Sequence, residues 1–370
     1  MRLLHFADLH LDTPFKWAKP QHAHQRRRAL RTTLETICQL AEERQVDALT
    51  CAGDLYEHDR FTPDTAKFLR DTFSALAPLR VLLAPGNHDW FGPGSLYQQV
   101  EWSDNVHVFN TTQLTALPFT EGVTIWGAAH CAPANTPNFL DDFQVDRGGI
   151  HIGLFHGSEQ GNLALQHSGK EPHAPFYADQ IRRSGLHHAL LGHFHKPVDG
   201  EFHTYPGNPD PLSFGEDGSR GAVVVEISDD GSITRERVRV ATTTANDVRV
   251  DVTGATHHNA VLHRISEATA ELHGAVRVTL EGTLEPDVDL RLLDIEASAP
   301  DHLDALLIQK GRLSIAESYD LERLAEEHTV RGQFVRDVLN SESLTEEQRQ
   351  RVLITGLRAL DANVNELEIL

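Results

Sequence analysis

Cysteine is scarce in this sequence, which has only Cys38, Cys51 and Cys131 in 370 residues. Their number is odd and their spacing is unpaired, which disfavours a disulfide framework and a thiolate zinc site. No stretch approaches the roughly 18 apolar residues that a membrane span needs. The chain starts MRLLHFADLH, with acidic and imidazole groups where a signal peptide has its apolar run. We therefore expect a cytoplasmic protein without an export signal or a membrane span.

Positive charge is also in short supply, because 33 Lys and Arg face 54 Asp and Glu and leave a net charge of −21. Such a charge repels the backbone of a nucleic acid, so any DNA must be bound by a local region whose charge differs from that of the whole chain. Residues 251–370 hold 23 acidic and 11 basic residues, a net of −12, whereas residues 1–44 have a net charge of +3. Within that basic segment, residues 26–28 are three arginines, which indicate either a solvated helix face or a ridge that contacts phosphate.

The overall composition is ordinary for a soluble globular protein, with 40% hydrophobic and 24% charged residues. The length predicts two or three domains. Histidine is the exception, with 23 residues. The functional question is therefore whether folding brings some of these histidines together.

Five apolar runs in the first 240 residues each end in polar residues. They are residues 2–6 before Asp8 and His10, 48–51 before Asp54, 81–84 before Asn87 and His88, 150–155 before His156, and 189–191 before His193 and His195. Helical periodicity over residues 24–44, and from Thr62 and Pro63 to residue 76, alternates with the first of these runs. This pattern predicts an α/β fold in which all five clusters lie on one rim, at the carboxyl ends of the strands. Further runs with short links predict additional β structure and a mixed sheet.

The last third has a different organisation. Residues 241–247 have no periodicity and are expected to link a domain of residues 1–240 to the rest. Alternation at 248–252, 276–280 and 288–292 predicts strands in a smaller domain of residues 248–315. Residues 316–370 are expected to be helical, with a capping box of Ser343 and Glu346. The apolar stripe of this region, at positions 353, 357 and 360, suits packing on its own chain or docking on a partner.

The polar clusters match the needs of phosphoester hydrolysis. Two metal ions about 3.5–4 Å apart can neutralise phosphoryl oxygens and activate water. Such a pair needs a bridging carboxylate and further Asp, His or Asn ligands from several strands. Taken singly, Asp-x-His or Gly-Asp is a common turn, whereas Gly86-Asn87-His88-Asp89 and Gly192-His193-Phe194-His195 are stronger signals. Their joint occurrence behind five strands predicts a two-metal site.

The order D-x-H, G-D, G-N-H-D, H and G-H-x-H resembles the calcineurin-like metallophosphoesterase superfamily over residues 1–240. Residues 5–15, the Pro-Gly-Asn-Pro of residues 206–209 and the Ser-Phe-Gly-Glu of residues 213–216 are similar to the SbcD and YhaO branch of bacterial DNA-repair exonucleases. The resemblance implies a sandwich of two mixed sheets flanked by helices, followed by a smaller α+β and helical region. It also implies a nuclease that works as a dimer with an SMC-like coiled-coil ATPase.

Carried over position by position, the resemblance assigns ligands and an acid. Asp8, His10, Asp54 and His195 would hold the first metal, and Asp54, Asn87, His156 and His193 the second. His88 matches the general acid, which gives a proton to the leaving oxygen. Manganese is the favoured metal. Residues 248–315 would be a capping domain that aligns DNA, and residues 316–370 a module that docks on the ATPase.

Asp89 is expected to have one of two roles: it orients His88 or it satisfies backbone donors in its loop. Glu57 departs from the commonest pattern of the family after Asp54. His187 and His188 are expected to be structural, and a solvated or core role is expected for His22, His24, His130, His167 and His173. Two other functions remain: a metallophosphoesterase for a small phosphoester or cyclic nucleotide, and a scaffold whose metals only brace the fold.

Overall fold

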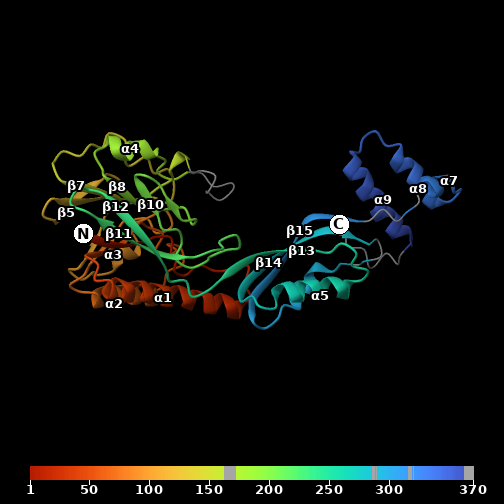
Figure 1. Cartoon of the computed structure of the whole chain (residues 1–370), viewed down its shortest axis with the longest axis horizontal. Coiled ribbons are helices and arrows are strands. Elements are labelled where there is room, and N and C mark those ends of the chain that lie inside the picture. Colours follow the sequence, from red (N-terminus) through yellow and green to blue (C-terminus); the bar gives the residue numbers. More distant parts are fainter. Residues whose placement is uncertain (162–171, 286–287, 289, 316–318, 320, 362–370) are drawn as a thin grey trace. The chain divides into compact units, whose positions relative to one another are not determined.

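The computed structural model describes residues 1–161, 172–285, 288, 290–315, 319 and 321–361. The chain forms two compact units, Met1–Ala245 and Asn246–Leu370 (Figure 1). The boundary between them falls inside residues 241–247, where the sequence predicts a linker. Among the described residues, none of the helices has the length and apolar character needed to cross a membrane.

The first unit contains β1 (Arg2–Phe6), α1 (Pro20–Glu43), β2 (Ala48–Cys51), α2 (Pro63–Ala75), β3 (Arg80–Leu83), α3 (Leu96–Gln99), β4 (Val106–Val108), β5 (Thr115–Thr120), β6 (Val123–Gly127), β7 (Ile150–His156), α4 (Ala178–Arg183), β8 (His188–Gly192), β9 (Val198–Asp199), β10 (His203–Tyr205), β11 (Gly221–Ile227) and β12 (Ile233–Arg239). The second unit contains β13 (Ala245–Asp251, whose first residue closes the first unit), α5 (His258–Thr269), β14 (Gly274–Leu284), α6 (Leu292–Ala297), β15 (Leu303–Ile315), α7 (Leu321–Glu326), α8 (Val330–Leu339) and α9 (Glu346–Asp361).

Two six-stranded sheets build the first unit, in the orders β12-β11-β1-β2-β3-β4 and β5-β6-β7-β8-β10-β9. Strands β1 to β4 are parallel, and β11 and β12 extend their sheet antiparallel. Strands β6, β7, β8 and β10 are parallel, and β5 and β9 flank them antiparallel. Both sheets are therefore mixed, which confirms the predicted fold class.

Alternation along β1 divides its side chains between two cores. Leu3 packs between the sheets in the same cluster as Leu190 of β8, whereas Leu4 packs in the cluster that contains Leu34 of α1. Helices α1 and α2 both contribute to that second cluster and lie side by side (Figure 1). This is the period of two that a strand buried on both faces requires.

The two helices begin where their sequence allows. The hydroxyl of Thr62 accepts a hydrogen bond from the backbone N–H of Thr65 at 3.3 Å, and Pro63 occupies the first turn of α2. This confirms the predicted start of α2. Helix α1 begins at Pro20, four residues before the predicted start, because proline suits a first turn.

Arg26 fits neither interpretation of the basic run at residues 26–28. Its side chain is buried, and its guanidinium donates to the carbonyl oxygens of Pro211 at 3.2 Å and Thr244 at 2.6 Å. The guanidinium also lies 4.8 Å from the centroid of the Trp17 ring. Arg26 is therefore neither solvated nor available to phosphate, and instead ties α1 to distant loops. Arg28 is exposed.

The second unit has a three-stranded sheet in the order β13-β14-β15, with β14 and β15 parallel. Its core includes Val276 and Ile308 from the sheet and Val261 from α5. The strand predicted at residues 288–292 is wrong, because the described residues there form a loop that leads into α6. Val288 and Leu290 are both buried, so the alternation reflects two loop side chains that fill the core.

Helices α7, α8 and α9 share a separate apolar cluster that includes Leu324, Val335 and Leu357. The predicted capping box of Ser343 and Glu346 is displaced by two residues. The backbone N–H of Thr345 donates to the side chain of Gln348 at 2.9 Å, and the N–H of Gln348 donates to the Thr345 hydroxyl at 3.3 Å. Thr345 directly precedes α9, so its hydroxyl reaches the first turn.

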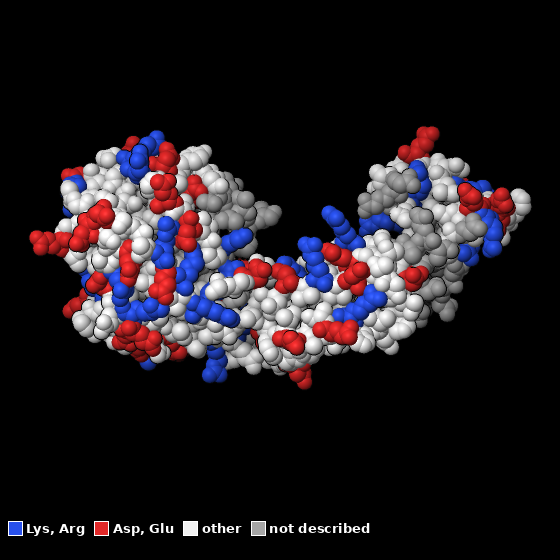
Figure 2. Space-filling view, in the orientation of Figure 1, with Lys and Arg blue, Asp and Glu red and all other residues white. Residues whose placement is uncertain are grey.

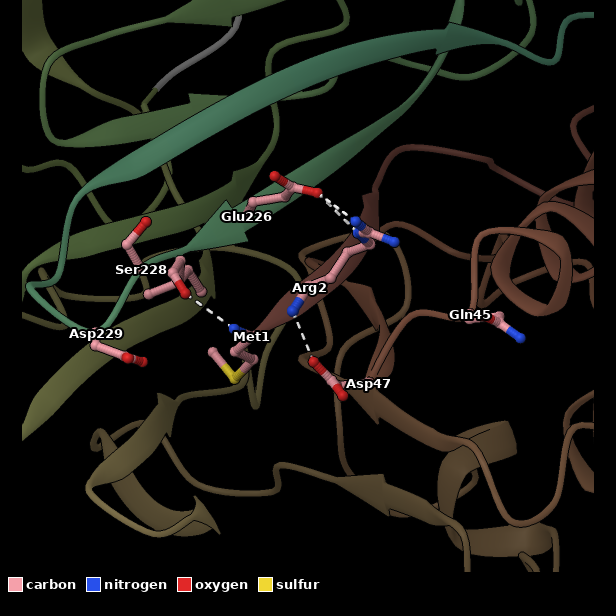
Figure 3. Close-up of a pocket in the computed structure, with 8 residues that line it drawn as sticks. Met1, Arg2, Gln45, Asp47, Glu226, Ser228 and Asp229 are labelled. Atoms are coloured by element: carbon pink, nitrogen blue, oxygen red, sulfur yellow. Dashed lines mark hydrogen bonds and ion pairs between the residues drawn. The ribbon is translucent and has the colours of Figure 1, made fainter.

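A polar hollow of about 490 Å³ lies at the amino end of β1 (Figure 3). The N–H of Arg2 donates to Asp47 at 2.7 Å, and its guanidinium pairs with Glu226 at 2.7 Å. The terminal ammonium of Met1 donates to the carbonyl oxygen of Ile227 at 2.9 Å. These groups tie β1 to its neighbours β2 and β11, at the end of β1 opposite to Asp8.

Candidate metal centre

All seven predicted ligands lie at the carboxyl ends of five strands, three in the first sheet and two in the second. Contacts across the sandwich show that the two rims meet. The backbone N–H of His193, after β8, donates to the two carboxylate oxygens of Asp8, after β1, at 3.0 and 3.1 Å. Nε2 of His156, on β7, lies 3.4 Å from Oδ2 of Asp54, after β2. The structure therefore brings the predicted clusters into one group.

The backbone at this rim is unusual. Asp8, His10, Asp54 and His193 all have positive φ, at 57°, 52°, 53° and 116°. Residues with a Cβ rarely adopt this region, at a cost of about 1–3 kcal/mol each, and such residues cluster at functional sites. The surrounding sandwich, rather than local preference, therefore aims these side chains.

Three glycines surround the imidazole of His156. A Cβ added at Gly53, Gly86 or Gly192 would lie 2.9 Å from Nδ1 of His156. At Gly192 the added atom would also lie 2.1 Å from the carbonyl oxygen of Ala52. These positions must be glycine because the strand ends approach the imidazole directly.

The hydrogen bonds of His156 fix its tautomer. Its Nδ1 lies 2.8 Å from the carbonyl oxygen of Ala52, which can only accept, so Nδ1 carries the proton. Nε2 then presents a lone pair to Asp54 and, at 3.1 Å, to Oδ1 of Asn87. Nδ1 of His193 lies 3.2 Å from the same Nε2. Electron-rich atoms thus converge where a cation would satisfy them.

A second group forms around His10 and His195. Nδ1 of His10 donates to Glu57 at 2.8 Å, and Nδ1 of His195 donates to Glu216 at 2.7 Å. Nε2 of His10 is buried without a hydrogen-bond partner among the described residues and lies 3.5 Å from Oδ2 of Asp54. One ligand atom from each of Asp8, His10 and His195 lies within 4.8 Å of the others. Asp54 therefore lies between the two groups.

Burial favours the neutral, ligating form of His10, His156 and His193. Desolvation lowers the pKa of His156 to about 4 and holds that of His193 well below its ordinary value. Burial, with the neighbouring charge of Asp54, raises the pKa of Asp8. Oxygen and imidazole ligands without thiolate, with an orphaned Nε2 on His10, fit a pair of divalent cations.

His88 lies beside the candidate ligands, with its side chain 32% exposed. Its backbone N–H donates to Oδ1 of Asp54 at 2.8 Å, and its Nδ1 lies 3.1 Å from Oε2 of Glu57. The His88 and His10 ring centroids are 4.8 Å apart. The imidazole is thus fixed beside the candidate ligands and remains open to a substrate.

Asp89 satisfies backbone donors rather than orienting His88, which decides between the two alternatives. Its carboxylate accepts from the N–H groups of Gly86 at 2.6 Å, Asp54 at 3.0 Å and Leu55 at 2.8 Å, and from the hydroxyl of Tyr97 at 2.6 Å. Asp89 therefore joins the loop after β2 to the loop after β3.

Glu57 and Glu216, which accept from the candidate ligands His10 and His195, are residues of the candidate site that the sequence does not assign. Glu57 is visible in the sequence as a departure from the family pattern, and Glu216 belongs to the Ser-Phe-Gly-Glu motif. His173, expected to be solvated or in the core, has its ring 5.4 Å from that of His193. It therefore lies beside the group.

The remaining histidines occupy varied positions. His130 is buried, with Nε2 2.8 Å from the His156 carbonyl oxygen, and His188 contacts Thr204. His24 and His187 are exposed, and His22 contacts Gln21. His167 lies outside the described residues.

Comparisons with known proteins give a matching family and several similar proteins. The model of the calcineurin-like phosphoesterase family matches residues 1–197. The chain is 28% identical over 306 residues to the uncharacterized metallophosphoesterase YhaO of Bacillus subtilis, covering 76% of this chain and 72% of the relative. It is 24% identical over 331 residues to the DNA double-strand break repair protein Mre11 of Methanopyrus kandleri, covering 81% and 69%. The solved structure of TT1561 of Thermus thermophilus has 13% identity and a TM-score of 0.36, covering 64% of this chain and 99% of that one.

Proposed function

Because the chain belongs to the calcineurin-like phosphoesterase family, whose members are metal-dependent hydrolases, we propose that it is a two-metal phosphodiesterase that cleaves DNA. The observation that carries the proposal is the convergence of His156 Nε2 and His10 Nε2 on the Asp54 carboxylate, with both Nδ1 protons engaged elsewhere. Such an arrangement of acceptors suits a cation.

The proposed ligands form two sets that share Asp54. Asp8, His10, Asp54 and His195 hold one ion, and Asp54, Asn87, His156 and His193 hold the other. When bound, the two ions supply positive charge to the phosphoryl oxygens and activate water as the nucleophile. The ligands combine carboxylate, amide and imidazole without thiolate, which suits manganese, iron or zinc. Manganese is the proposed metal because the resemblance to nucleases of the family favours it.

The chain's own groups supply the rest of the chemistry. Protonated His88 donates from Nε2 to the leaving oxygen, while Glu57 holds Nδ1 and so fixes the direction of Nε2. The amide of Asn87 is buried beside His156 and, with the metals, would hold the negative charge that develops on the phosphoryl group. For cleavage that runs from the 3′ end, the leaving oxygen is O3′ of the sugar.

DNA is supported as the substrate by the relatives rather than by net charge. The similarity to the repair protein Mre11 of Methanopyrus kandleri covers 81% of the chain, well beyond residues 1–197. Acidic and basic side chains are interspersed on the face of the molecule in Figure 2. DNA would therefore be held mainly by the ions in the site, whose charge exceeds that of the Asp8 and Asp54 carboxylates.

The proposal extends to the assembly. The chain would act in the cytoplasm as a homodimeric nuclease subunit in DNA repair, with an SMC-like coiled-coil ATPase as its partner. Residues 248–315 would align DNA, and the helices of residues 316–370 would dock on the ATPase. Leu360, which is 46% exposed on α9, is available to such a contact.

A substrate panel tests this function. The protein with manganese is given end-labelled single- and double-stranded DNA, a nitrophenyl phosphodiester and a nucleoside monophosphate, with and without a candidate ATPase. We expect DNA to be cleaved most efficiently. Strong preference for the small esters would favour the alternative of a small phosphoester or cyclic nucleotide. Metal-replete protein without turnover on any of them would favour a scaffold.

A further inference from the structure

Glu216 is the centre of a hydrogen-bond network that holds the side chain of His195. Glu216 is 4% exposed, and its Oε1 accepts from Nδ1 of His195. The other oxygen, Oε2, accepts from the amide of Asn208 at 2.6 Å and from the N–H groups of Leu212 at 2.7 Å and Ser213 at 3.2 Å. Three donors therefore fix the carboxylate independently of His195.

The backbone of His195 is held by the same segment. Its carbonyl oxygen accepts from the N–H of Asn208 at 3.1 Å and from the guanidinium of Arg220, which is itself buried. A Cβ at Gly207, where φ is +75°, would lie 2.6 Å from that oxygen. Residues of the Pro-Gly-Asn-Pro and Ser-Phe-Gly-Glu motifs thus hold both the side chain and the backbone of His195.

The half of the site that contains His10 and His195 and the half that contains His156 differ in the group that accepts the Nδ1–H of the imidazole. His10 and His195 each donate Nδ1–H to a carboxylate, whereas His156 donates to the neutral carbonyl of Ala52. A carboxylate behind a ligating imidazole makes its other nitrogen a stronger donor to a metal and adds negative charge near the ion. The half that contains His10 and His195 therefore attracts a cation more strongly.

We propose that Glu216 is a positioning residue that makes the half formed by Asp8, His10 and His195 the tighter of two unequal metal sites. This inference rests on the proposed two-metal function and adds the order in which the sites fill. Glu57 also backs His10, but it contacts His88 as well. Glu216 is the cleaner probe, because its carboxylate backs His195 and is held by residues 208–213 rather than by the candidate acid.

Manganese binding to the full chain tests the proposal, measured by titration calorimetry and by the electron paramagnetic resonance of free Mn²⁺. The wild type is expected to bind two ions with unequal affinity, and His195→Ala should remove the tighter class. Glu216→Gln should weaken the tighter class by about 10–100-fold and leave the weaker class within about twofold. A glutamine has one acceptor oxygen and so cannot serve both His195 and the donors of Asn208, Leu212 and Ser213.

Two further variants make the result decisive. Asp210→Asn is the matched control, because Asp210 is a buried carboxylate of the same segment that accepts from Thr33 and Thr242 rather than from a candidate ligand. It should leave both classes unchanged. Glu216→Asp keeps the charge and should weaken the tighter class less than Glu216→Gln, and it carries the test if circular dichroism shows that Glu216→Gln is unfolded.

The outcomes separate this inference from the proposed function. Unchanged binding in Glu216→Gln, equal weakening of both classes, or loss of the weaker class in His195→Ala would overturn the inference while the two-metal function stood. Wild-type protein that binds no manganese would overturn the function itself. Unequal sites that respond as expected, in a protein that leaves DNA intact, would retain the inference and remove the substrate proposal.

Discussion

Nε2 of His156 and Oδ2 of Asp54 lie 3.4 Å apart with no proton to place between them. The proton of the imidazole is on Nδ1, where it meets the Ala52 carbonyl, and the Asp54 carboxylate accepts from the backbone N–H of His88 through its other oxygen, Oδ1. Two buried acceptors at this distance destabilise the fold unless a cation joins them. We therefore expect metal binding at this centre to stabilise the fold.

Metal should raise the thermal stability of the protein through Asp54. A cation that binds only the folded chain stabilises it by about 2.7 kcal/mol at 100 times its Kd. We expect Tm to rise with Mn²⁺ and to fall with chelator, and Asp54→Asn to lose most of this response. Differential scanning calorimetry measures it.

Asp47→Asn is the matched control for this experiment, because Asp47 precedes the same strand at its opposite end and contacts Arg2 (Figure 3). It should keep the full response to metal. An equal Mn²⁺ shift in wild type and Asp54→Asn would contradict the assignment of Asp54.

His88→Ala should separate chemistry from metal binding. The variant keeps the backbone N–H that donates to Asp54, so both ions should still bind. Loss of the acid should lower kcat by about 10²–10⁴-fold. Turnover and metal content are measured on the same preparations.

The exposed His187 supplies the control for His88, since His187→Ala should have wild-type turnover and metal content. Full activity in His88→Ala would remove His88 from the mechanism. Loss of metal together with activity would make His88 a contributor to the metal centre instead.

The sequence could predict the candidate ligands at the strand ends because each of them closely follows a buried apolar run. Asp8, Asp54 and His156 come from strands whose carboxyl ends share a rim, and topology alone then brings them together. Glu57 and Glu216 could not be assigned in this way. They lie in loops, and their pairing with His10 and His195 depends on tertiary packing across 47 and 21 residues.

Residues 26–28 and 288–292 have local sequence patterns that more than one structure can produce. The arginines of residues 26–28 have the sequence pattern of an exposed helix face, yet Arg26 is buried. Its partners Pro211 and Thr244 lie about 200 residues away in sequence, so a local pattern cannot reveal this burial. Alternation at residues 288–292 predicts a strand, although a loop can bury Val288 and Leu290 with the same period. Alternation of apolar residues indicates which side chains are buried, but a strand and a loop can both bury alternate residues.

Gly192→Ala should destabilise the protein and weaken metal binding. The new Cβ would lie 2.1 Å from the Ala52 carbonyl oxygen and 2.9 Å from Nδ1 of His156, so β8 or the imidazole must move. We expect a loss of about 1–3 kcal/mol in the free energy of unfolding. Urea unfolding in chelator measures the loss without the metal contribution.

Gly148→Ala is the control for that substitution, because a Cβ there meets nothing within 4 Å and the residue has no positive φ. Its free energy of unfolding should stay within about 0.5 kcal/mol of wild type. If Gly192→Ala were equally neutral, the close approach of β8 to His156 would be wrong.

Acid should destabilise the protein through His188, whose side chain is buried on β8. Burial lowers its pKa from 6.5 to about 3, so the unfolded chain binds the proton first as the pH falls. The stability that neutral His188 supplies is complete above about pH 6.5 and is lost toward pH 3, which amounts to about 2 kcal/mol between pH 7 and pH 5. Urea unfolding in chelator at these two pH values should therefore show a smaller decline for His188→Gln than for wild type, by about that amount. His187→Gln, at the exposed neighbouring position, should follow the wild type. Parallel declines in His188→Gln and wild type would show that His188 is not held neutral by the fold.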